Sequence, residues 1–443
     1  MGKPATARRA SSDADPLMGG CHAGVMAQSP DDNERRVDDN HYGAGTPVSD
    51  CGPQPLAGVR VIEFCNVAAG PFCGSLLADM GAEVIKVESS TGDSLRSWPP
   101  LNEGFSENFA SLNRNKQSIV LNLKDKADHD IARRLVDGAD VVIENNRPGV
   151  MVRLGLGYEE CARDHPELIY CSMSAFGQDG PRSQEGGFDV TIQAISGIMS
   201  VTGEPGGAPV KCGVPISDFA AGLYGSFAVT SLLARVRSGG AGGHIDVPMQ
   251  GVSLAIAALQ TSELFGTGAD PKKLGSAHPR NAPYEAFEAE DGHFVLAAGN
   301  DKLWGLVTDI VGRPDLMTDD RFLTTTDRAA HQDELKTTLE TVFRTKPAAH
   351  WLSVFATNGV PSGPINTYSQ ALDDDQVRER GWVQPLTLGN GQETRTFASP
   401  LAIDGERPPI RNGPPQLDAD REEILAELDR RTHRPSSPDD EPT

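Results

Sequence analysis

An early strand-helix-strand unit constrains the fold most strongly. Gly58-Val-Arg-Val-Ile-Glu-Phe64 is a short β-rich run, and a turn from Asn66 to Pro71 leads into a helical pattern. Gly81 ends that helix, and Glu83-Val-Ile-Lys-Val-Glu88 is a second strand. Two strands joined by one helix over so short a stretch are typical of a β-α-β crossover, which places the strands parallel.

The same alternation continues along the chain. Ser118 to Leu123 is predicted to be the third strand, Lys126 to Val136 a helix, and Ala139 to Glu144 the fourth strand. Leu168 to Ser174 adds a further apolar run of strand length. Strands that alternate with helices indicate an α/β fold with a Rossmann-like, doubly wound large domain.

In such a fold the ligand lies beyond the carboxyl ends of the strands, where loops and helix N-termini present free N–H groups. The loop Asn145 to Gly149 occupies such a position, and no G-x-G-x-x-G follows the first strand, so a dinucleotide is poorly supported. Lys124, Arg147 and Arg153 lie among the expected strand ends. These cations either hold a nucleotide phosphate or are ordinary solvated surface groups.

Asp218 begins a long run of small and apolar residues that carries no charge until Arg235. An aspartate at this place is either a helix N-cap, which accepts free N–H groups, or a buried reactive carboxylate. The most apolar stretch, Phe219 to Ala234, is shorter than the roughly 20 residues of a bilayer span and contains Gly, Ser and Thr. We therefore expect a buried helix and no membrane partner.

Composition narrows the class of protein. A chain of 443 residues exceeds one ordinary domain, which predicts two lobes. A formal net charge of −22 and a pI near 4.8 argue against nucleic acid as a partner. The seven cysteines show no paired metal-ligand spacing, so we expect reduced thiols, no metal and a cytoplasmic location.

Both ends differ from the rest of the chain. Residues 1–53 lack apolar periodicity and are rich in Ala, Gly, Ser and Asp, which predicts a disordered extension. Their acidic residues do not fit a targeting peptide. Residues 430–443 are polar and proline-rich, and we expect a loose tail.

Many ordered motifs between about Pro55 and Glu427 resemble the class III CoA-transferase family, which contains formyl-CoA and carnitine CoA-transferases and α-methylacyl-CoA racemases. The motifs are Pro55-Leu-Ala-Gly-Val-Arg-Val-Ile-Glu-Phe64, Ala69-Gly-Pro71, Leu76 to Glu88, Asn113-Arg-Asn-Lys116, Glu144-Asn-Asn-Arg-Pro-Gly149, Leu154-Gly-Leu-Gly157, Phe176-Gly-Gln-Asp-Gly-Pro181, Gly187-Phe-Asp189, Gln193-Ala-Ile-Ser-Gly197 and Gly213-Val-Pro-Ile-Ser-Asp218.

The resemblance implies an interlocked homodimer and a definite division of the chain. The large CoA-binding domain takes residues 54–251, and residues 373–429 form a linker and return to it. Between them, residues 252–273 are a linker and residues 274–372 form a smaller α+β domain. The resemblance also implies acyl-CoA and a carboxylic acid as substrates, with no permanently bound cofactor.

By the same resemblance Asp218 is the nucleophile, which forms an aspartyl anhydride and then an aspartyl-CoA thioester. The implied CoA contacts are Ala68, Leu121, Lys124, Asn145, Asn146, Arg147 and Arg153, with Phe188 and Asp189 near the thioester. A family cation is missing at Ser89, and Arg96 or Arg114 are candidate substitutes.

The transferase branch is favoured over the racemase branch. Phe188 stands where the racemases have a proton-moving histidine, and Asn300 stands where they have an acid. Neither side chain can act as a general base, although a shift of one position would bring Asp301 into the second place. A racemase or isomerase with an altered base, and a catalytically silent CoA-binding member, remain alternatives.

The substrate is less constrained by the sequence. Segments 275–284 and 359–366 look most like members that use succinyl-CoA as donor for short dicarboxylic acids. Arg280 either pairs with the distal carboxylate of such an acid or is a surface cation. The segment Leu274-Gly-Ser-Ala-His-Pro279 either closes the site, with His278 lining it, or is an ordinary turn before a strand.

Overall fold

A computed structural model of the chain describes residue 52 and residues 54–432. The predicted extension, apart from Gly52, and residues 433–443 of the predicted tail lie outside the described residues. Residues 430–432 belong to the last helix, α17.

The centre of the large domain is a six-stranded, fully parallel sheet with the order β5-β2-β1-β6-β7-β8. The strands are β1 (Arg60–Phe64), β2 (Glu83–Glu88), β5 (Lys116–Val120), β6 (Val141–Glu144), β7 (Ile169–Ser174) and β8 (Gly243–Pro248). The predicted α/β class with a parallel sheet is thus confirmed. The order runs outward from β1 in both directions, as in a Rossmann fold, and reverses between β1 and β6.

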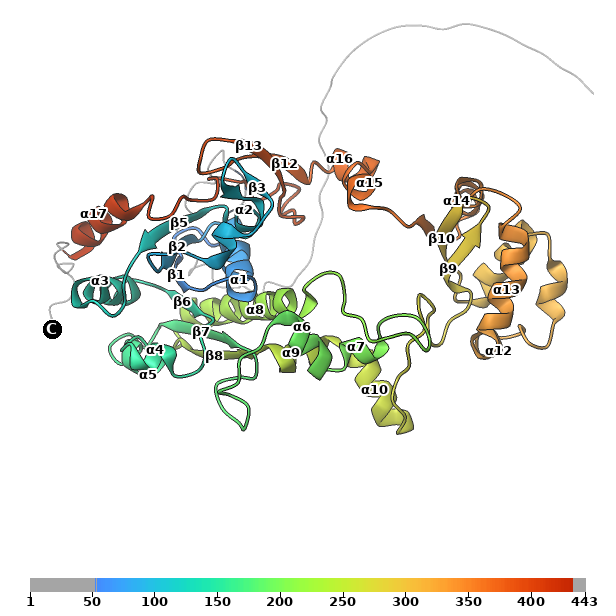
Figure 1. Cartoon of the computed structure of the whole chain (residues 1–443), viewed down its shortest axis with the longest axis horizontal. Helices are drawn as coiled ribbons and strands as arrows, with labels where there is room; N and C mark the ends of the chain where they lie inside the picture. Colours follow the sequence, from blue (N-terminus) through green and yellow to red (C-terminus); the bar gives the residue numbers. More distant parts are fainter. Residues whose placement is uncertain (1–51, 53, 433–443) are drawn as a thin grey trace, which may run out of the picture. The chain divides into compact units, whose positions relative to one another are not determined.

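Helices cover both faces of this sheet (Figure 1). One face packs against α1 (Ala69–Asp79), α8 (Ile216–Arg237) and α9 (Met249–Ile256). The other face packs against α3 (Lys126–Asp137) and α17 (Arg421–Thr432). Strands β1, β6 and β7 are buried along their whole length, as expected for a sheet covered on both faces, whereas the edge strand β8 is only partly buried.

The contact between α1 and α8 depends on glycine. A Cβ atom at Gly222 would lie 2.9 Å from the carbonyl oxygen of Ala69, and one at Gly225 would collide with Met173. Helix α8 has 22 residues and is therefore longer than the apolar stretch Phe219 to Ala234. By length and composition alone, α8 is long and apolar enough to cross a membrane. The small residues of one side of α8 pack against α1, whereas Leu223 and Phe227 are exposed, so the helix that we expected to be buried is buried on one side only.

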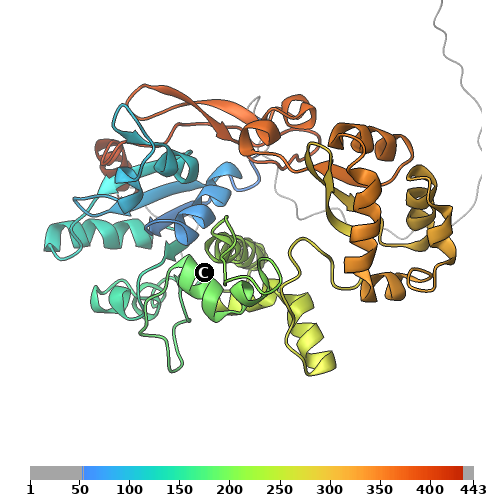
Figure 2. The same cartoon turned by 45° about the vertical axis from the view of Figure 1, so that its right-hand side comes forward.

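A second group of elements has its own hydrophobic core. Strands β9 (Tyr284–Ala289), β10 (Gly292–Ala297) and β11 (Ser362–Pro364) form an antiparallel sheet. Its helices are α11 (Asp301–Ile310), α12 (Thr325–Ala330), α13 (Gln332–Phe343) and α14 (Ala348–Thr357), shown beside β9 and β10 in Figure 1 and from another side in Figure 2. The core is aromatic, with Trp304, Phe287, Phe294, Phe343 and Phe355 fully buried. An antiparallel sheet with helices is the α+β arrangement expected for this part, and the exact boundaries at 274 and 372 stay predictions.

The remaining elements are short. They are α2 (Glu107–Asn113), α4 (Val150–Arg153), α5 (Tyr158–Cys161), α6 (Asp189–Ile195), α7 (Ile198–Val201), α10 (Ala258–Thr267), α15 (Tyr368–Leu372), α16 (Asp375–Glu379), β3 (Leu101–Asn102), β4 (Phe105–Ser106), β12 (Val383–Thr387), β13 (Glu393–Phe397) and 3-10 turns at Ser94–Ser97 and Pro314–Thr318. The predicted linker 252–273 therefore contains α10 and most of α9.

The C-terminal part of the chain returns to the first part of the sheet. The Asp418 carboxylate accepts the backbone N–H of Val120 at 2.7 Å, and Asp420 accepts that of Ser118 at 2.8 Å. Ile424 of α17 is buried in the core beneath the sheet. These aspartates satisfy the outer edge of β5, so the edge strand is covered by the chain's own C-terminal segment.

Candidate active site

The turns after β1 and β6 meet where the strand order reverses, which is the place where open α/β sheets bind ligands. Asn66 in the first turn donates its backbone N–H to the Asn145 side-chain oxygen at 2.9 Å. The Asn145 amide nitrogen donates back to the Asn66 carbonyl at 2.7 Å. Two reciprocal hydrogen bonds therefore join the loops that form this edge of the sheet.

A cavity of about 230 Å³ opens between these turns and the start of α8. Five of the predicted site residues line it, namely Ala68, Asn145, Asn146, Phe188 and Asp218. The turn Asn66–Ala69 contributes four consecutive residues to its wall. Residues far apart in the sequence thus converge on one concave site.

Asp218 is the third residue of α8, and Pro215 occupies the N-cap position. The N-cap interpretation of Asp218 is therefore wrong, because the helix starts one turn earlier than the charge pattern suggested. Within the described residues its half-buried carboxylate has no hydrogen-bond or ion-pair partner. Burial, together with the nearby negative charge of Asp189, raises the pKa of Asp218 to about 7.

Asp189 positions the segment that carries Asp218. One Asp189 oxygen accepts the backbone N–H of Ser217 at 2.9 Å, and the other accepts the Gln193 amide at 2.6 Å. Gln193 in turn accepts the backbone N–H of Cys212 at 2.8 Å. Asp189 lines none of the cavities described here, so its visible role is to fix the first turn of α8. Gln193 was missed as a site residue. Its only sequence signal is its place at the start of the motif Gln193-Ala-Ile-Ser-Gly197, and the structure shows that it is fully buried.

The raised pKa of Asp218 has a measurable cost in stability. Between about pH 4 and pH 7 the folded chain keeps a proton on Asp218 that the unfolded chain releases, so rising pH favours unfolding through this window. Asp218→Asn removes the cost, and its melting temperature is expected to exceed the parent's by more at about pH 8 than at about pH 5. Asp179→Asn, on the exposed loop after β7, is the control. Equal shifts at both pH values would contradict the pKa of Asp218.

Two further cavities share Asn146 with the first. One, of about 490 Å³, lies beyond β2 and β5 and is lined by Ser89, Leu121 and Lys124. The other, of about 300 Å³, is lined by Arg147 and Phe188. A continuous series of concave surfaces therefore runs along the carboxyl ends of the strands.

The other predicted cations lie elsewhere. Arg153 is exposed at the end of α4, lines none of these three cavities and places its guanidinium against Gly149. Arg96 is paired with Glu88 at 2.6 Å, and Arg114 is paired with Asp79. Neither Arg96 nor Arg114 is a free substitute for the cation missing at Ser89, because a buried carboxylate already engages each of them.

The two residues considered as a racemase base are also engaged. Asn300 caps α11, since its side-chain oxygen accepts the Leu303 N–H at 2.9 Å. Asp301 pairs with the fully buried Arg328 at 2.7 Å, and this hydrogen bond lowers the pKa of Asp301. A general base needs a free lone pair and a suitable pKa, and neither residue provides both.

The segment before β9 is an ordered turn. His278 uses its Nδ1 atom to accept the backbone N–H groups of Arg280 at 3.2 Å and Asn281 at 3.1 Å. Arg280 pairs with Glu263 at 3.1 Å on an exposed surface. These contacts match the turn interpretation of the segment, and the role of Arg280 in substrate binding stays a prediction.

The five cysteines in the described part of the chain are free, and four are buried. Within residue 52 and residues 54–432, no group of three or more His, Cys, Asp or Glu side chains is arranged to hold a metal ion. The groups that line the cavities at the switch point include the Asp218 carboxylate and the amides of Asn145 and Asn146.

Comparison with known proteins identifies the class of site. The family model for CoA-transferase family III matches residues 56–421. The chain belongs to this family. It is 40% identical to the acetyl-CoA:oxalate CoA-transferase of Acetobacter aceti, over 84% of this chain and 95% of the relative. The succinate–glutarate CoA-transferase of Agrobacterium fabrum is 38% identical, over 85% of this chain and 96% of the relative.

A solved structure supports the same conclusion. The crystal structure of a CaiB/BaiF family protein from Brucella suis superimposes with a TM-score of 0.76 at 37% identity, covering 85% of this chain and all of that one. The resemblance seen in the sequence motifs is thus confirmed. This family III chain is an acyl-CoA:carboxylate CoA-transferase, since relatives with that activity match it over most of its length.

Proposed function

We propose that this protein moves CoA from an acyl-CoA donor, with succinyl-CoA as the best candidate, to a short carboxylic or dicarboxylic acid through Asp218. The observation that carries the proposal is the unpaired Asp218 carboxylate in the cavity at the switch point. A carboxylate without a partner is free to act as a nucleophile, and its raised pKa increases its basicity.

The steps conserve the energy of the thioester. The Asp218 carboxylate attacks the donor carbonyl, and the tetrahedral intermediate expels CoA thiolate to leave a mixed anhydride. The thiolate then attacks the Asp218 carbonyl, which forms an aspartyl-CoA thioester and releases the donor acid. An incoming carboxylate reverses these two steps on a new acid. Water has to be excluded throughout, because it would hydrolyse both intermediates.

The three cavities provide a route for CoA as a substrate, with no permanently bound cofactor. Leu121 and Lys124 line the cavity farthest from Asp218 along the strand ends, where the nucleotide would lie. Asn146 lines all three cavities, Asn145 lines the two that also contain Phe188, and Arg147 lines the one of about 300 Å³. In a chain with a net charge of −22, these local cations are needed to hold a phosphate.

The names of the relatives support carboxylic acids as substrates. One is a transferase between acetyl-CoA and oxalate and the other acts on succinate and glutarate, so both include a short dicarboxylic acid. For this chain we infer a dicarboxylic acid as acceptor.

An interlocked homodimer is the assembly that we propose. Large apolar side chains stand exposed on α8, α10 and α15, with 71% of Phe227, 84% of Phe265 and 78% of Tyr368 accessible. Exposed apolar groups of this size favour an interface over a free surface. The free thiols support a cytoplasmic location as a proposal.

The test is mass-resolved CoA transfer from succinyl-CoA to a panel of short mono- and dicarboxylic acids. We expect new acyl-CoA products with one or more dicarboxylic acids, together with stoichiometric release of succinate. Transfer from another donor only would keep the reaction and overturn succinyl-CoA as donor. No product with any donor and acid would overturn the proposed function and favour a silent CoA-binding protein.

Incubation of the protein with acyl-CoA in deuterium oxide, without an acceptor acid, tests the racemase alternative. No deuterium is expected at the α-carbon of the acyl group, because Phe188 cannot move a proton and Asp301 is held by Arg328. Incorporation of deuterium would identify an isomerase or racemase that uses a different base.

A further inference from the structure

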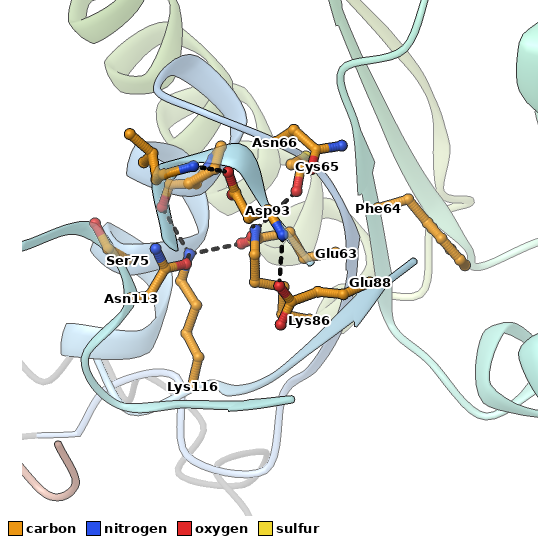
Figure 3. Close-up of polar contacts among 12 residues, drawn as sticks. Glu63, Phe64, Cys65, Asn66, Ser75, Lys86, Glu88, Asp93, Asn113 and Lys116 are labelled. Carbon is orange, nitrogen blue, oxygen red and sulfur yellow. Dashed lines mark hydrogen bonds and ion pairs between the residues drawn. The ribbon is translucent and has the colours of Figure 1, made fainter. Parts of the chain in front are cut away.

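Four charged side chains form a sealed cluster under the turn after β1 (Figure 3). Lys86 lies 2.9 Å from Glu63 and 3.0 Å from Asp93, and Lys116 lies 2.8 Å from the other oxygen of Glu63. All four side chains are fully buried. Two positive and two negative charges balance, so the cluster satisfies itself without solvent.

The remaining hydrogen bonds of the cluster include three to the backbone of the turn. Lys86 Nζ donates to the Cys65 carbonyl at 2.7 Å, and Lys116 Nζ donates to the Pro71 carbonyl at 2.8 Å. The Val67 N–H donates to both oxygens of the Asp93 carboxylate, at 3.1 and 3.2 Å. The turn is thus held before, within and after the residues that face the cavity.

Val67 adopts a conformation that its side chain disfavours. Its φ angle is 62°, in the left-handed region, where a β-branched residue is a genuine outlier. Such a conformation persists only when the surrounding structure imposes it. Asp93 imposes it here, and Asp93 is itself fixed by the Leu95 N–H at 3.0 Å and by Lys86.

The turn that is held in this way forms the wall of the cavity opposite Asp218. Residues Asn66–Ala69 line the cavity together with Asp218. The backbone N–H groups of Ala68 and Ala69, at the start of α1, have no partner among the described residues. Free N–H groups at a helix N-terminus favour negative charge, which is what develops during attack on a thioester.

We propose that this cluster is a positioning device for CoA transfer. Asp93, held by Lys86 and Glu63, fixes Val67 in the left-handed conformation and so sets where the free N–H groups of Ala68 and Ala69 lie relative to Asp218. The inference rests on the proposed role of Asp218 as nucleophile. It explains why four charges occupy a buried site where apolar side chains of similar size would hold the fold equally well.

Asp93→Asn is the first test. Asp93 Oδ1 accepts the N–H groups of Val67 and Leu95, and Oδ2 pairs with Lys86. In the Asp93→Asn protein an NH₂ group replaces one oxygen, so the side chain either places a donor against the Lys86 ammonium or turns its donor toward Val67, and the anchor of the turn is weakened in both cases. We expect kcat to fall by about 100-fold, the loss typical of a misplaced catalytic group, with little change in the KM for acyl-CoA. Hydrogen exchange of the amides in residues 65–71 is expected to rise.

Asp79→Asn is the matched control. Asp79 is also a buried aspartate of the large domain, at the far end of α1, where it pairs with Arg114 and Asn115. It makes no contact with the turn. Its replacement is expected to lower the melting temperature while kcat and amide exchange in residues 65–71 stay unchanged.

Val67→Gly separates positioning from general stability. Glycine adopts the left-handed conformation without strain, so the turn no longer needs Asp93 to impose it. In the Val67→Gly background, Asp93→Asn is expected to cost at least about tenfold less in kcat than in the parent. An equal cost in both backgrounds, or equal losses in Asp93→Asn and Asp79→Asn, would overturn the proposal.

Hydrogen exchange of the backbone amides tests the positioning role of Asp93 separately from the proposed CoA-transfer function. A parent protein without transfer activity would overturn the proposed function, and exchange in residues 65–71 would still decide whether Asp93 fixes the turn. Unchanged exchange in Asp93→Asn overturns the positioning role whatever the activity.

Discussion

Replacing Asp218 with asparagine is expected to lower kcat for CoA transfer by on the order of 10⁴-fold or more, because an amide cannot form the anhydride. The side chain keeps its shape, and the carboxylate that it replaces has no partner among the described residues, so the wall of the cavity should be preserved. Folding and acyl-CoA binding are therefore expected to survive, which makes the loss specific to the chemical step.

The covalent intermediate provides the measurement. Parent protein mixed with donor alone should release the donor acid and gain the mass of CoA less one water, as an aspartyl-CoA thioester requires, and peptide mapping should place the adduct on Asp218. The Asp218→Asn protein should gain none, whereas Asp179→Asn, on an exposed loop, should behave as the parent. A CoA adduct that persists in Asp218→Asn would assign the nucleophile to another residue.

Glu63→Gln is expected to have the largest effect on stability. Glu63 is the shared anion of Lys86 and Lys116, and all three side chains are fully buried. Removing its charge leaves two buried ammonium groups with one remaining carboxylate partner in the cluster, Asp93. Loss of one partner from a buried ion pair typically costs about 3–5 kcal/mol of unfolding free energy.

Urea unfolding of the two proteins measures this cost. Asp130→Asn is the comparison, because Asp130 and Lys126 form an ion pair of similar length, 2.7 Å, that is solvent-exposed. Exposed pairs contribute about 0–1 kcal/mol. A loss in Glu63→Gln no larger than that in Asp130→Asn would show that the buried cluster does not stabilise the fold.

Much of the large domain is predictable from the sequence because its strands are buried on both faces. Runs such as 83–88 and 139–144 are short, rich in Val and Ile and bounded by turns, and the structure has strands at both places. The meeting of the loops 66–71 and 145–149 at one cavity also follows from the strand pattern, since parallel strands bring their carboxyl ends to a single edge. The choice of Ala68, Asn145 and Asn146 within these loops comes from the family resemblance.

The side-chain partners could not be predicted in the same way. Glu63 and Lys86 lie inside apolar strand runs, and a charge in such a run signals a buried partner without naming it. The partner of Glu63 at Lys116 is 53 residues away, and no periodicity links the two. The hydrogen bonds from the Ser217 N–H and the Gln193 amide to the Asp189 carboxylate could not be predicted either, and the place of Asp189 near the thioester stays a prediction.

The covering of β5 by the C-terminal segment affects folding during synthesis on the ribosome. Asp418 accepts the N–H of Val120, a residue 298 positions earlier in the chain. At about 5–20 residues per second, a ribosome needs about 15–60 s to add that length, and until then the outer edge of β5 is open. An open strand edge is a template for pairing with other chains. Nascent chains that stop before Asp418 are therefore expected to be prone to aggregation. A C-terminal truncation at this point would expose the edge of the central sheet.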